Sequence, residues 1–246
     1  MALQKLDRLG LSLLEQSEEI NYPQLDHKFA WQQLDLSPVT HAYRGESAEH
    51  SFTLGPIDLT FKSGELVFIV GGNGSGKSTL VKLITGLYTP ETGQIQVDTQ
   101  PITEQNREWY HQHFSVVFAD FYLFEQLLGI NKINLHQVQD YINLLQLEQK
   151  VQVKDGKLST IALSQGQRKR LALLTAYLED RPIYIFDEWA SDQDPVFKEI
   201  FYTQLLVQLR NRGKTVLVIS HDDRYFHLGD RIIKLDYGKI EYDKYV

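Results

Sequence analysis

The sequence predicts an α/β fold in which a mostly parallel sheet is flanked by helices. Short apolar runs at residues 66–70, 183–186 and 216–219 have the length and residue types of strands buried on both faces. Helical patterns at residues 77–87 and 195–210 follow the first two runs. This alternation of strand and helix is typical of chains that build a parallel sheet with helices against its faces.

The remaining elements are delimited by turn residues. Gly55-Pro56 and Ser63-Gly64 bound one short strand, and residues 120–180 are expected to be mainly helical, with a polar interruption at 154–156. Tyr237-Gly238 indicates the turn of a terminal hairpin. The strands expected outside the three apolar runs are 34–43, 57–61, 94–97, 114–118, 231–236 and 239–242.

The first thirty residues differ from the rest of the chain. Residues 1–16 place leucines near helical spacing, although Gly10 weakens this helix. Residues 17–28, with Pro23, are typical of a linker. We therefore expect an N-terminal helix and linker over residues 1–30 and one domain over residues 31–246.

The composition excludes several classes of function. The net charge is −7 and no basic tract stands out, which argues against nucleic acid as a partner. The chain has no cysteine, which excludes disulfides and thiolate metal sites. No stretch approaches the roughly 20 mostly apolar residues of a membrane span, and the start lacks the pattern of a signal peptide. We expect the chain as given to be soluble.

A glycine-rich loop lies between the first apolar run and the helix that follows it. Residues 71–78 match G-x-x-x-x-G-K-[ST] in full, the sequence of a phosphate-binding loop. Its glycines let backbone N–H groups surround phosphate oxygens at a helix N-terminus. Lys77 is predicted to reach the β- and γ-phosphates, and Ser78 to bind Mg²⁺. A glycine-rich turn that binds nothing is the alternative. The predicted nucleotide-binding residues are Gly71, Gly72, Asn73, Gly74, Ser75, Gly76, Lys77, Ser78 and Thr79.

Two carboxylates end the apolar run at 183–186. The carboxyl ends of parallel strands open onto the ligand crevice, so Asp187 is predicted to hold Mg²⁺, through water. Glu188 is then placed to take a proton from an attacking water. A strand ending in Asp-Glu is common by chance, and the prediction depends on its pairing with the phosphate loop.

His221 follows the apolar run at 216–219. At this strand end it is predicted to contact the γ-phosphate and help orient the water. The alternatives are a structural histidine and a metal cluster formed by His221, Asp222 and Asp223.

The run Leu163-Ser164-Gln165-Gly166-Gln167 precedes the helical pattern at 168–178. It closely resembles the LSGGQ signature of ATP-binding-cassette (ABC) proteins, with Gln165 at the first glycine position. A hydroxyl and a glycine at a helix N-terminus suit a γ-phosphate, although an ordinary serine N-cap is the alternative. The order of the motifs decides for the family, which the sequence resembles over residues 34–243.

The resemblance implies a P-loop NTPase core, an N-terminal antiparallel β subdomain and an inserted helical subdomain at about 120–180. It also implies a head-to-tail homodimer with ATP, in which Ser164, Gly166 and Gln167 bind the nucleotide of the second copy. Tyr43 matches the aromatic residue that stacks on adenine, with core packing as the alternative. Asp194 matches the aspartate of the D-loop at the dimer interface.

A finer resemblance is to exporters of cyclic peptides and siderophore precursors, such as those for pyoverdine and syringomycin. It rests on three stretches, 187–195, 220–226 and 117–129. Residues 2–14 also resemble the stretch that joins the last membrane helix to the cassette in such fused proteins. The alternative is a helix that packs on its own domain.

One position departs from the family pattern. The Q-loop glutamine, which contacts Mg²⁺, aligns with Ala119, and alanine cannot coordinate a metal. Either Asp120 acts through a water or Mg²⁺ coordination is incomplete.

These observations favour an ATP-hydrolysing cassette that drives export through a transmembrane domain, fused upstream or encoded separately, at the cytoplasmic face of a bacterial inner membrane. A cassette acting on DNA or the ribosome is disfavoured by the acidic balance and the lack of a sustained heptad pattern. A regulatory subunit that scarcely hydrolyses ATP is favoured slightly by Ala119 and opposed by Glu188 and His221.

Overall fold

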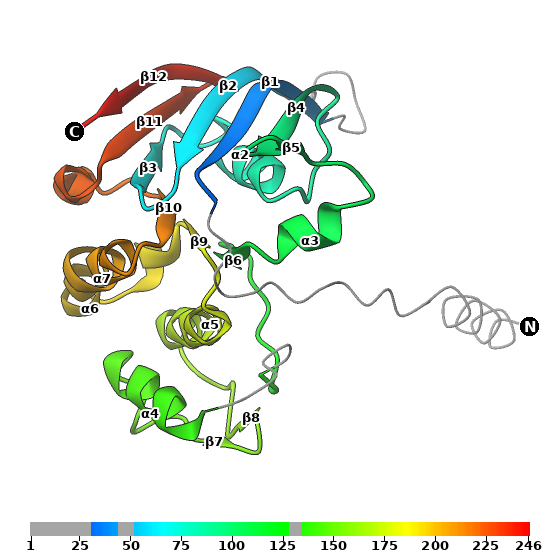
Figure 1. The fold of residues 1–246 in the computed structure, drawn as a ribbon. Coiled ribbons are helices and arrows are strands. Elements are labelled where there is room, and N and C mark those ends of the chain that lie inside the picture. Colours follow the sequence, from blue (N-terminus) through cyan, green and yellow to red (C-terminus); the bar gives the residue numbers. More distant parts are fainter. Residues whose placement is uncertain (1–30, 44–51, 128–133) are drawn as a thin grey trace, which may run out of the picture.

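The computed structural model of the chain describes residues 31–43, 52–127 and 134–246 (Figure 1). The expected N-terminal helix of residues 1–16 and the linker at 17–28 lie outside these residues. None of the helices in the described ranges has the length and apolar character needed to cross a bilayer.

A six-stranded sheet forms the centre of the fold, in the order β12-β11-β3-β10-β9-β6. Its neighbours pair in parallel except for β12, which runs antiparallel to β11. The predicted mostly parallel sheet and terminal hairpin are therefore confirmed. The strands are β3 (Leu66–Val70), β6 (Phe114–Val117), β9 (Ile183–Asp187), β10 (Thr215–Ile219), β11 (Arg231–Asp236) and β12 (Lys239–Tyr245).

The central strands are apolar throughout because their two faces serve two different cores. In β3, Leu66, Phe68 and Val70 join the core that contains α5 (Gln165–Glu179), α6 (Pro195–Ile200) and α7 (Leu206–Asn211). Val67 and Ile69 join the core that contains α2 (Lys77–Ile84) and the second sheet. Successive side chains of a strand point to opposite faces, so a strand covered on both sides needs apolar residues at every position.

The second sheet is antiparallel, in the order β2-β1-β4-β5. It is the antiparallel β subdomain that the family resemblance implied. Its strands are β1 (Gln33–Tyr43), β2 (Phe52–Lys62), β4 (Thr92–Val97) and β5 (Gln100–Pro101). The expected boundary at Gly55-Pro56 is wrong, because this cis peptide lies inside β2 and the strand continues across it, starting at Phe52.

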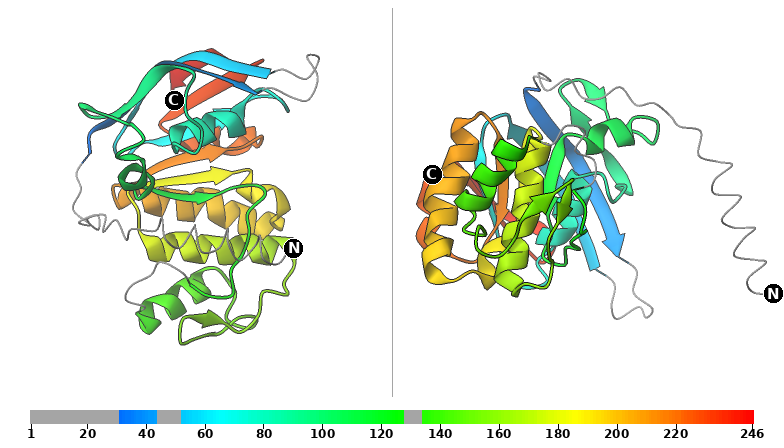
Figure 2. Two further views of the ribbon diagram at one scale, coloured as in Figure 1. Left: turned by 90° about the vertical axis from the view of Figure 1, so that its right-hand side faces the viewer. Right: turned by 90° about the horizontal axis from the view of Figure 1, so that it is seen from below.

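Helices cover both faces of the central sheet. Figure 2 (left) shows α5, α6 and α7 below the parallel strands and α2 above them, beneath the antiparallel sheet. The helical stretch expected at 195–210 is confirmed. The helices are α2 (Lys77–Ile84), α3 (Arg107–His111), α4 (Leu135–Leu144), α5 (Gln165–Glu179), α6 (Pro195–Ile200), the π-helical turn η3 (Phe201–Leu205) and α7 (Leu206–Asn211), with 3₁₀ turns η2 (Trp189–Asp192) and η4 (Asp223–Leu228).

The expectation of a mainly helical stretch at 120–180 is only partly right. Between α4 and α5 the chain forms a small hairpin of β7 (Val153–Lys154) and β8 (Lys157–Leu158). Its turn residues Asp155 and Gly156 have φ of 51° and 72°. Asp-Gly with two positive φ angles is a favoured two-residue hairpin turn. The sequence analysis predicts only a polar interruption of the helical stretch at this place.

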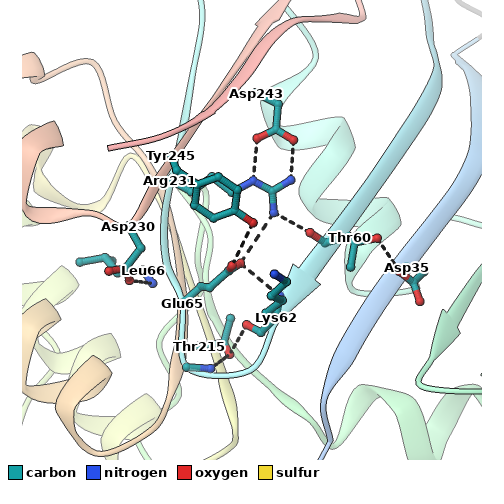
Figure 3. A network of polar contacts seen from close by, with 11 residues as sticks. Asp35, Thr60, Lys62, Glu65, Leu66, Thr215, Asp230, Arg231, Asp243 and Tyr245 are labelled. Carbon is teal, nitrogen blue, oxygen red and sulfur yellow. Dashed lines mark hydrogen bonds and ion pairs between the residues drawn. The ribbon is translucent and has the colours of Figure 1, made fainter.

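A buried arginine fixes the C-terminal hairpin against both sheets. Arg231 forms an ion pair with Asp243 of β12, donates to the carbonyl oxygen of Thr60 in β2, and lies 3.7 Å from Glu65 beside β3 (Figure 3). The hairpin turn then reaches the phosphate loop, where the N–H of Gly238 donates to the carbonyl oxygen of Ser75 at 3.0 Å. The C-terminal hairpin therefore holds the phosphate loop in place through the backbone of Ser75.

Candidate active site

The phosphate loop connects the end of β3 to α2 and depends on glycine at defined places. Gly71 and Gly76 have φ of 145° and 103°. A Cβ atom at Gly71 would lie 2.3 Å from the carbonyl oxygen of Leu235, and one at Gly76 would lie 2.8 Å from the side chain of Leu54. Only glycine combines these backbone angles with such close contacts, so the shape of the loop requires glycine at both positions.

Lys77 lies buried beneath this loop. Its ammonium donates to the carbonyl oxygens of Gly71 and Gly72, at 3.0 Å each. Burial lowers the pKa of Lys77, while the carboxylates of Glu188 and Asp187 raise it. Within the described residues, the buried Ser75 hydroxyl has no hydrogen-bond partner. A cation and an unsatisfied hydroxyl inside a loop at a helix N-terminus are suited to an anion such as phosphate.

The donors for a metal ion lie beside this loop. Asp187, at the end of β9, is 3% exposed, and burial raises its pKa while a hydrogen bond from Ser78 lowers it. Its Oδ1 atom has no partner among the described residues. A hydroxyl and a carboxylate with a spare oxygen are the hard ligands that Mg²⁺ takes next to a phosphate, so these residues fit the ion.

Glu188 and His221 face each other at the ends of neighbouring strands. Since β9 and β10 are parallel, Asp187 pairs with Ile219, and the residues that follow lie side by side. His221 Nε2 is 3.1 Å from Glu188 Oε1. Glu188 adopts a left-handed φ of 50°, which is uncommon outside glycine and is found where a site requires it.

Glu188 lines two cavities. One, of about 420 Å³, opens over the phosphate loop and is also lined by Lys77, Ser78 and Tyr43. The other, of about 260 Å³, lies on the His221 side. The structure thus brings the predicted residues Lys77, Ser78, Asp187, Glu188 and His221 together, with a carboxylate at the junction of two spaces large enough for water.

Tyr43 lies at the wall of the larger cavity and is 58% exposed, so it does not pack in the core. Phe52, its partner across the β1–β2 ladder, lines the same cavity and is not among the residues that the sequence predicts for the site. The alternation of apolar residues at Phe52 and Leu54 is typical of a strand and could have predicted this position. The turn expected at Gly55-Pro56 placed both residues outside the predicted strand.

The predicted signature residues do not reach the phosphate loop of the same chain. Ser164 is exposed and caps α5: its hydroxyl accepts from the N–H of Gln167, whose side chain accepts from the N–H of Ser164. A Cβ atom at Gly166 would lie 2.5 Å from the carbonyl oxygen of Asp192. None of the three lines either cavity. The N-cap alternative therefore describes the geometry of Ser164 within one chain.

Asp194 also has partners within its own chain. Its carboxylate caps α6 by accepting from the N–H of Phe197 at 3.0 Å, and it forms an ion pair with Arg170. These contacts lower its pKa, the backbone hydrogen bond from Phe197 most of all. The side chain remains 54% exposed.

The side chains of His221, Asp222 and Asp223 are not arranged as the ligands of a metal cluster. Asp222 forms ion pairs with Lys198 at 2.9 Å and Arg224 at 2.8 Å, and in the part of the chain that the structure describes no three carboxylate or imidazole side chains group as metal ligands.

The chain is similar to ATP-binding proteins of transporters. It is 52% identical over 233 residues to the ATP-binding protein SyrD of Pseudomonas syringae pv. syringae, a match that covers 93% of this chain and 41% of SyrD. It is 35% identical over 210 residues to the nisin transport ATP-binding protein NisT of Lactococcus lactis subsp. lactis, with 78% and 34% covered. The chain thus matches less than half the length of these relatives.

Solved structures agree with this similarity. The dimeric, post-hydrolysis structure of the ATP-binding cassette MJ0796 bound to ADP and Pi superposes with a TM-score of 0.74 at 26% identity, covering 86% of this chain and 98% of MJ0796. The family model of the ABC transporter matches residues 54–191, more than half of the chain. The chain therefore belongs to the ABC transporter family, as an ATP-binding domain of the kind that hydrolyses ATP.

Proposed function

We propose that this chain hydrolyses ATP in the cavity above the phosphate loop, with Glu188 as the general base. The observation that carries the proposal is the position of Glu188 at the junction of both cavities, 3.1 Å from His221 and beside Lys77 and Asp187. A carboxylate there can accept a proton from a water that attacks the γ-phosphate.

The other residues bind and orient the nucleotide. Tyr43 stacks on the adenine, and Lys77 with the loop N–H groups holds the β- and γ-phosphates. His221 hydrogen-bonds the γ-phosphate and orients the attacking water. The exposed ring of Tyr43 and the cavity that it shares with Lys77 support these roles.

Ser78 and Asp187 would hold Mg²⁺, which neutralises charge on the phosphate oxygens when bound. Ala119 offers no ligand at the Q-loop position. Burial is the main cause of the raised pKa of Asp187, and the nearby charge of Asp120, the next residue after Ala119, adds to it. We therefore place Asp120 near enough to the ion to hold it through a water.

The complete site requires a second copy of the chain. Ser164, Gly166, Gln167 and Asp194 line neither cavity of their own chain, and Ser164 is exposed at a helix N-terminus suited to phosphate. We place them on the nucleotide of a partner copy in a head-to-tail dimer. The dimeric state of the MJ0796 cassette supports this arrangement.

The dimer would drive a membrane transporter from the cytoplasmic face. Residues 31–246 form the ATP-binding domain, with a helical subdomain at about 120–180, and a transmembrane domain is fused upstream or separate. The resemblance of residues 187–195, 220–226 and 117–129 to exporters of cyclic peptides and siderophore precursors supports export of such a compound. The similarity to the nisin transport ATP-binding protein NisT supports a role in transport. ATP can power such a cycle only because it favours the closed dimer over the open one.

Glu188→Gln tests the proposal. Turnover of ATP should fall about 10²–10⁴-fold, the usual share of a general base, while the affinity for ATP is retained. Glu148→Gln, which alters an exposed glutamate outside both cavities, is the matched control. Parental turnover in Glu188→Gln would remove Glu188 from this role, and scarcely any phosphate release from the parental chain would favour a regulatory nucleotide-binding subunit.

A further inference from the structure

A buried lysine of α5 is bound entirely to the loop that carries Glu188. Lys169 is 2% exposed. Its ammonium donates to the carbonyl oxygen of Glu188 at 2.9 Å and to the hydroxyl of Ser191 at 3.0 Å, and it forms an ion pair with Asp192 at 2.7 Å. Because an ammonium has three donors and no acceptor, all its hydrogen-bonding capacity is directed at residues 188–192.

Burial of a charge is unfavourable unless the charge is fully paired. A movement of the 188–192 loop away from Lys169 would leave the buried ammonium unpaired, so these contacts restrict the loop. The carbonyl oxygen that Lys169 holds belongs to Glu188, the residue with the left-handed φ of 50°. The hydroxyl of Ser191 donates to the same oxygen at 2.8 Å. The peptide that follows Glu188 is thus fixed from two sides, and its orientation sets the direction in which the carboxylate leaves the backbone.

Further contacts join α5 to the same loop. The indole N–H of Trp189 donates to the carbonyl oxygen of Lys169 at 2.9 Å, and the ring is buried. Nearer the start of the helix, Gly166 lies against the carbonyl oxygen of Asp192 and accepts from the side chain of Gln193 at 3.0 Å. The helix that begins at Ser164 and the loop that begins at Glu188 therefore form one packed unit.

We propose that Lys169 is a positioning residue for Glu188. It holds the strained backbone at Glu188 so that the carboxylate faces His221 and the larger cavity. Through α5, it also links the position of Ser164 to that of Glu188 in the same chain. This inference rests on the proposed hydrolysis of ATP, and it assigns to Lys169 no contact with the nucleotide.

The test is Lys169→Met, measured in the 246-residue chain. Turnover should fall about 10–100-fold, because a misplacement of about 1 Å can cost that much, while KM and the Kd for ATP stay within about twofold of the parent. Lys214→Met is the control, since Lys214 holds Asp180 at the other end of α5 and has no contact with the 188–192 loop. It should leave turnover unchanged.

A double substitution distinguishes positioning from general stability. In the Glu188→Gln background, Lys169→Met should lower turnover by less than about threefold, because the group that it positions is already lost. Ser191→Ala, a milder change that removes one partner of Lys169, should lower turnover several-fold and covers the case in which Lys169→Met does not fold.

The results separate the two proposals. A parental chain that hydrolyses ATP, with parental turnover in Lys169→Met or with the same fold loss in the Glu188→Gln background, overturns the role of Lys169 alone. A parental chain that does not hydrolyse ATP overturns the proposed function, and the role of Lys169 with it.

Discussion

The starts of α2 and α5 are both helix N-termini suited to phosphate, yet they are built differently. The start of α2 is enclosed: the loop wraps a buried lysine and opens into a cavity of about 420 Å³. The start of α5 lines neither cavity, and its exposed Ser164 forms reciprocal hydrogen bonds with Gln167. One helix start is therefore part of an enclosed cavity in its own chain, whereas the other is open, as our proposal that it caps the nucleotide of a second copy requires.

The largest effect is expected from a substitution inside the enclosed site. Asp187→Asn should lower ATP turnover about 10²–10³-fold, because a metal ligand that neutralises phosphate charge is lost. Burial, more than any other cause, raises the pKa of Asp187, so at neutral pH its charged form is less favourable in the folded chain than in the unfolded one. The same substitution should therefore raise the free energy of unfolding, by about 1 kcal/mol.

Thermal unfolding and phosphate release, measured on the same preparation, test this pair of effects. A variant that is both less stable and inactive would show that Asp187 is held by partners other than those seen here.

Loss of the exposed cap should have an intermediate effect. Ser164→Ala removes an N-cap, which costs about 1 kcal/mol of stability. It also removes the proposed hydrogen bond to a charged phosphate, whose loss corresponds to about 10–100-fold in turnover. Asn134→Ala is the control, since the Asn134 side chain also caps a helix, by accepting from two N–H groups at the start of α4, and lines neither cavity.

Both substitutions should lower the stability alike, and only Ser164→Ala should lower turnover at saturating ATP. Equal turnover in the two variants would reduce Ser164 to an ordinary helix cap.

The smallest effect is expected at the rim of the enclosed site. Tyr43→Ala should weaken ATP binding about 2–10-fold, the contribution of one aromatic stacking contact, without changing turnover at saturation. Tyr43→Phe should bind as the parent does, because the ring and not the hydroxyl makes the contact. Titration with a fluorescent ATP analogue measures both, and an unchanged affinity in Tyr43→Ala would separate this ring from the nucleotide.

The sequence predicted the enclosed site better than the exposed one. The loop at 71–78 and the acidic end of β9 are local patterns whose geometry follows from a strand, a turn and a helix. The parallel pairing of β9 with β10 then brings Glu188 to His221, two residues that the sequence placed separately at strand ends.

What could not be predicted depends on contacts between distant segments. The continuation of β2 through Gly55-Pro56, which places Phe52 in the cavity, requires the second sheet as a template. Lysine is usually exposed on a helix, whereas Lys169 is buried and its ammonium contacts the 188–192 loop. The Asp155-Gly156 pair, by contrast, is a local signal for a two-residue hairpin turn, which the structure forms.

The association of two copies around ATP is tested most directly by the mass of the Glu188→Gln chain in solution. Sedimentation of this variant should show a monomer without nucleotide and a dimer with saturating Mg-ATP, and Ser164→Ala in the same background should weaken the dimer. A chain that remains monomeric at saturating Mg-ATP, with the nucleotide bound, would contradict the shared site.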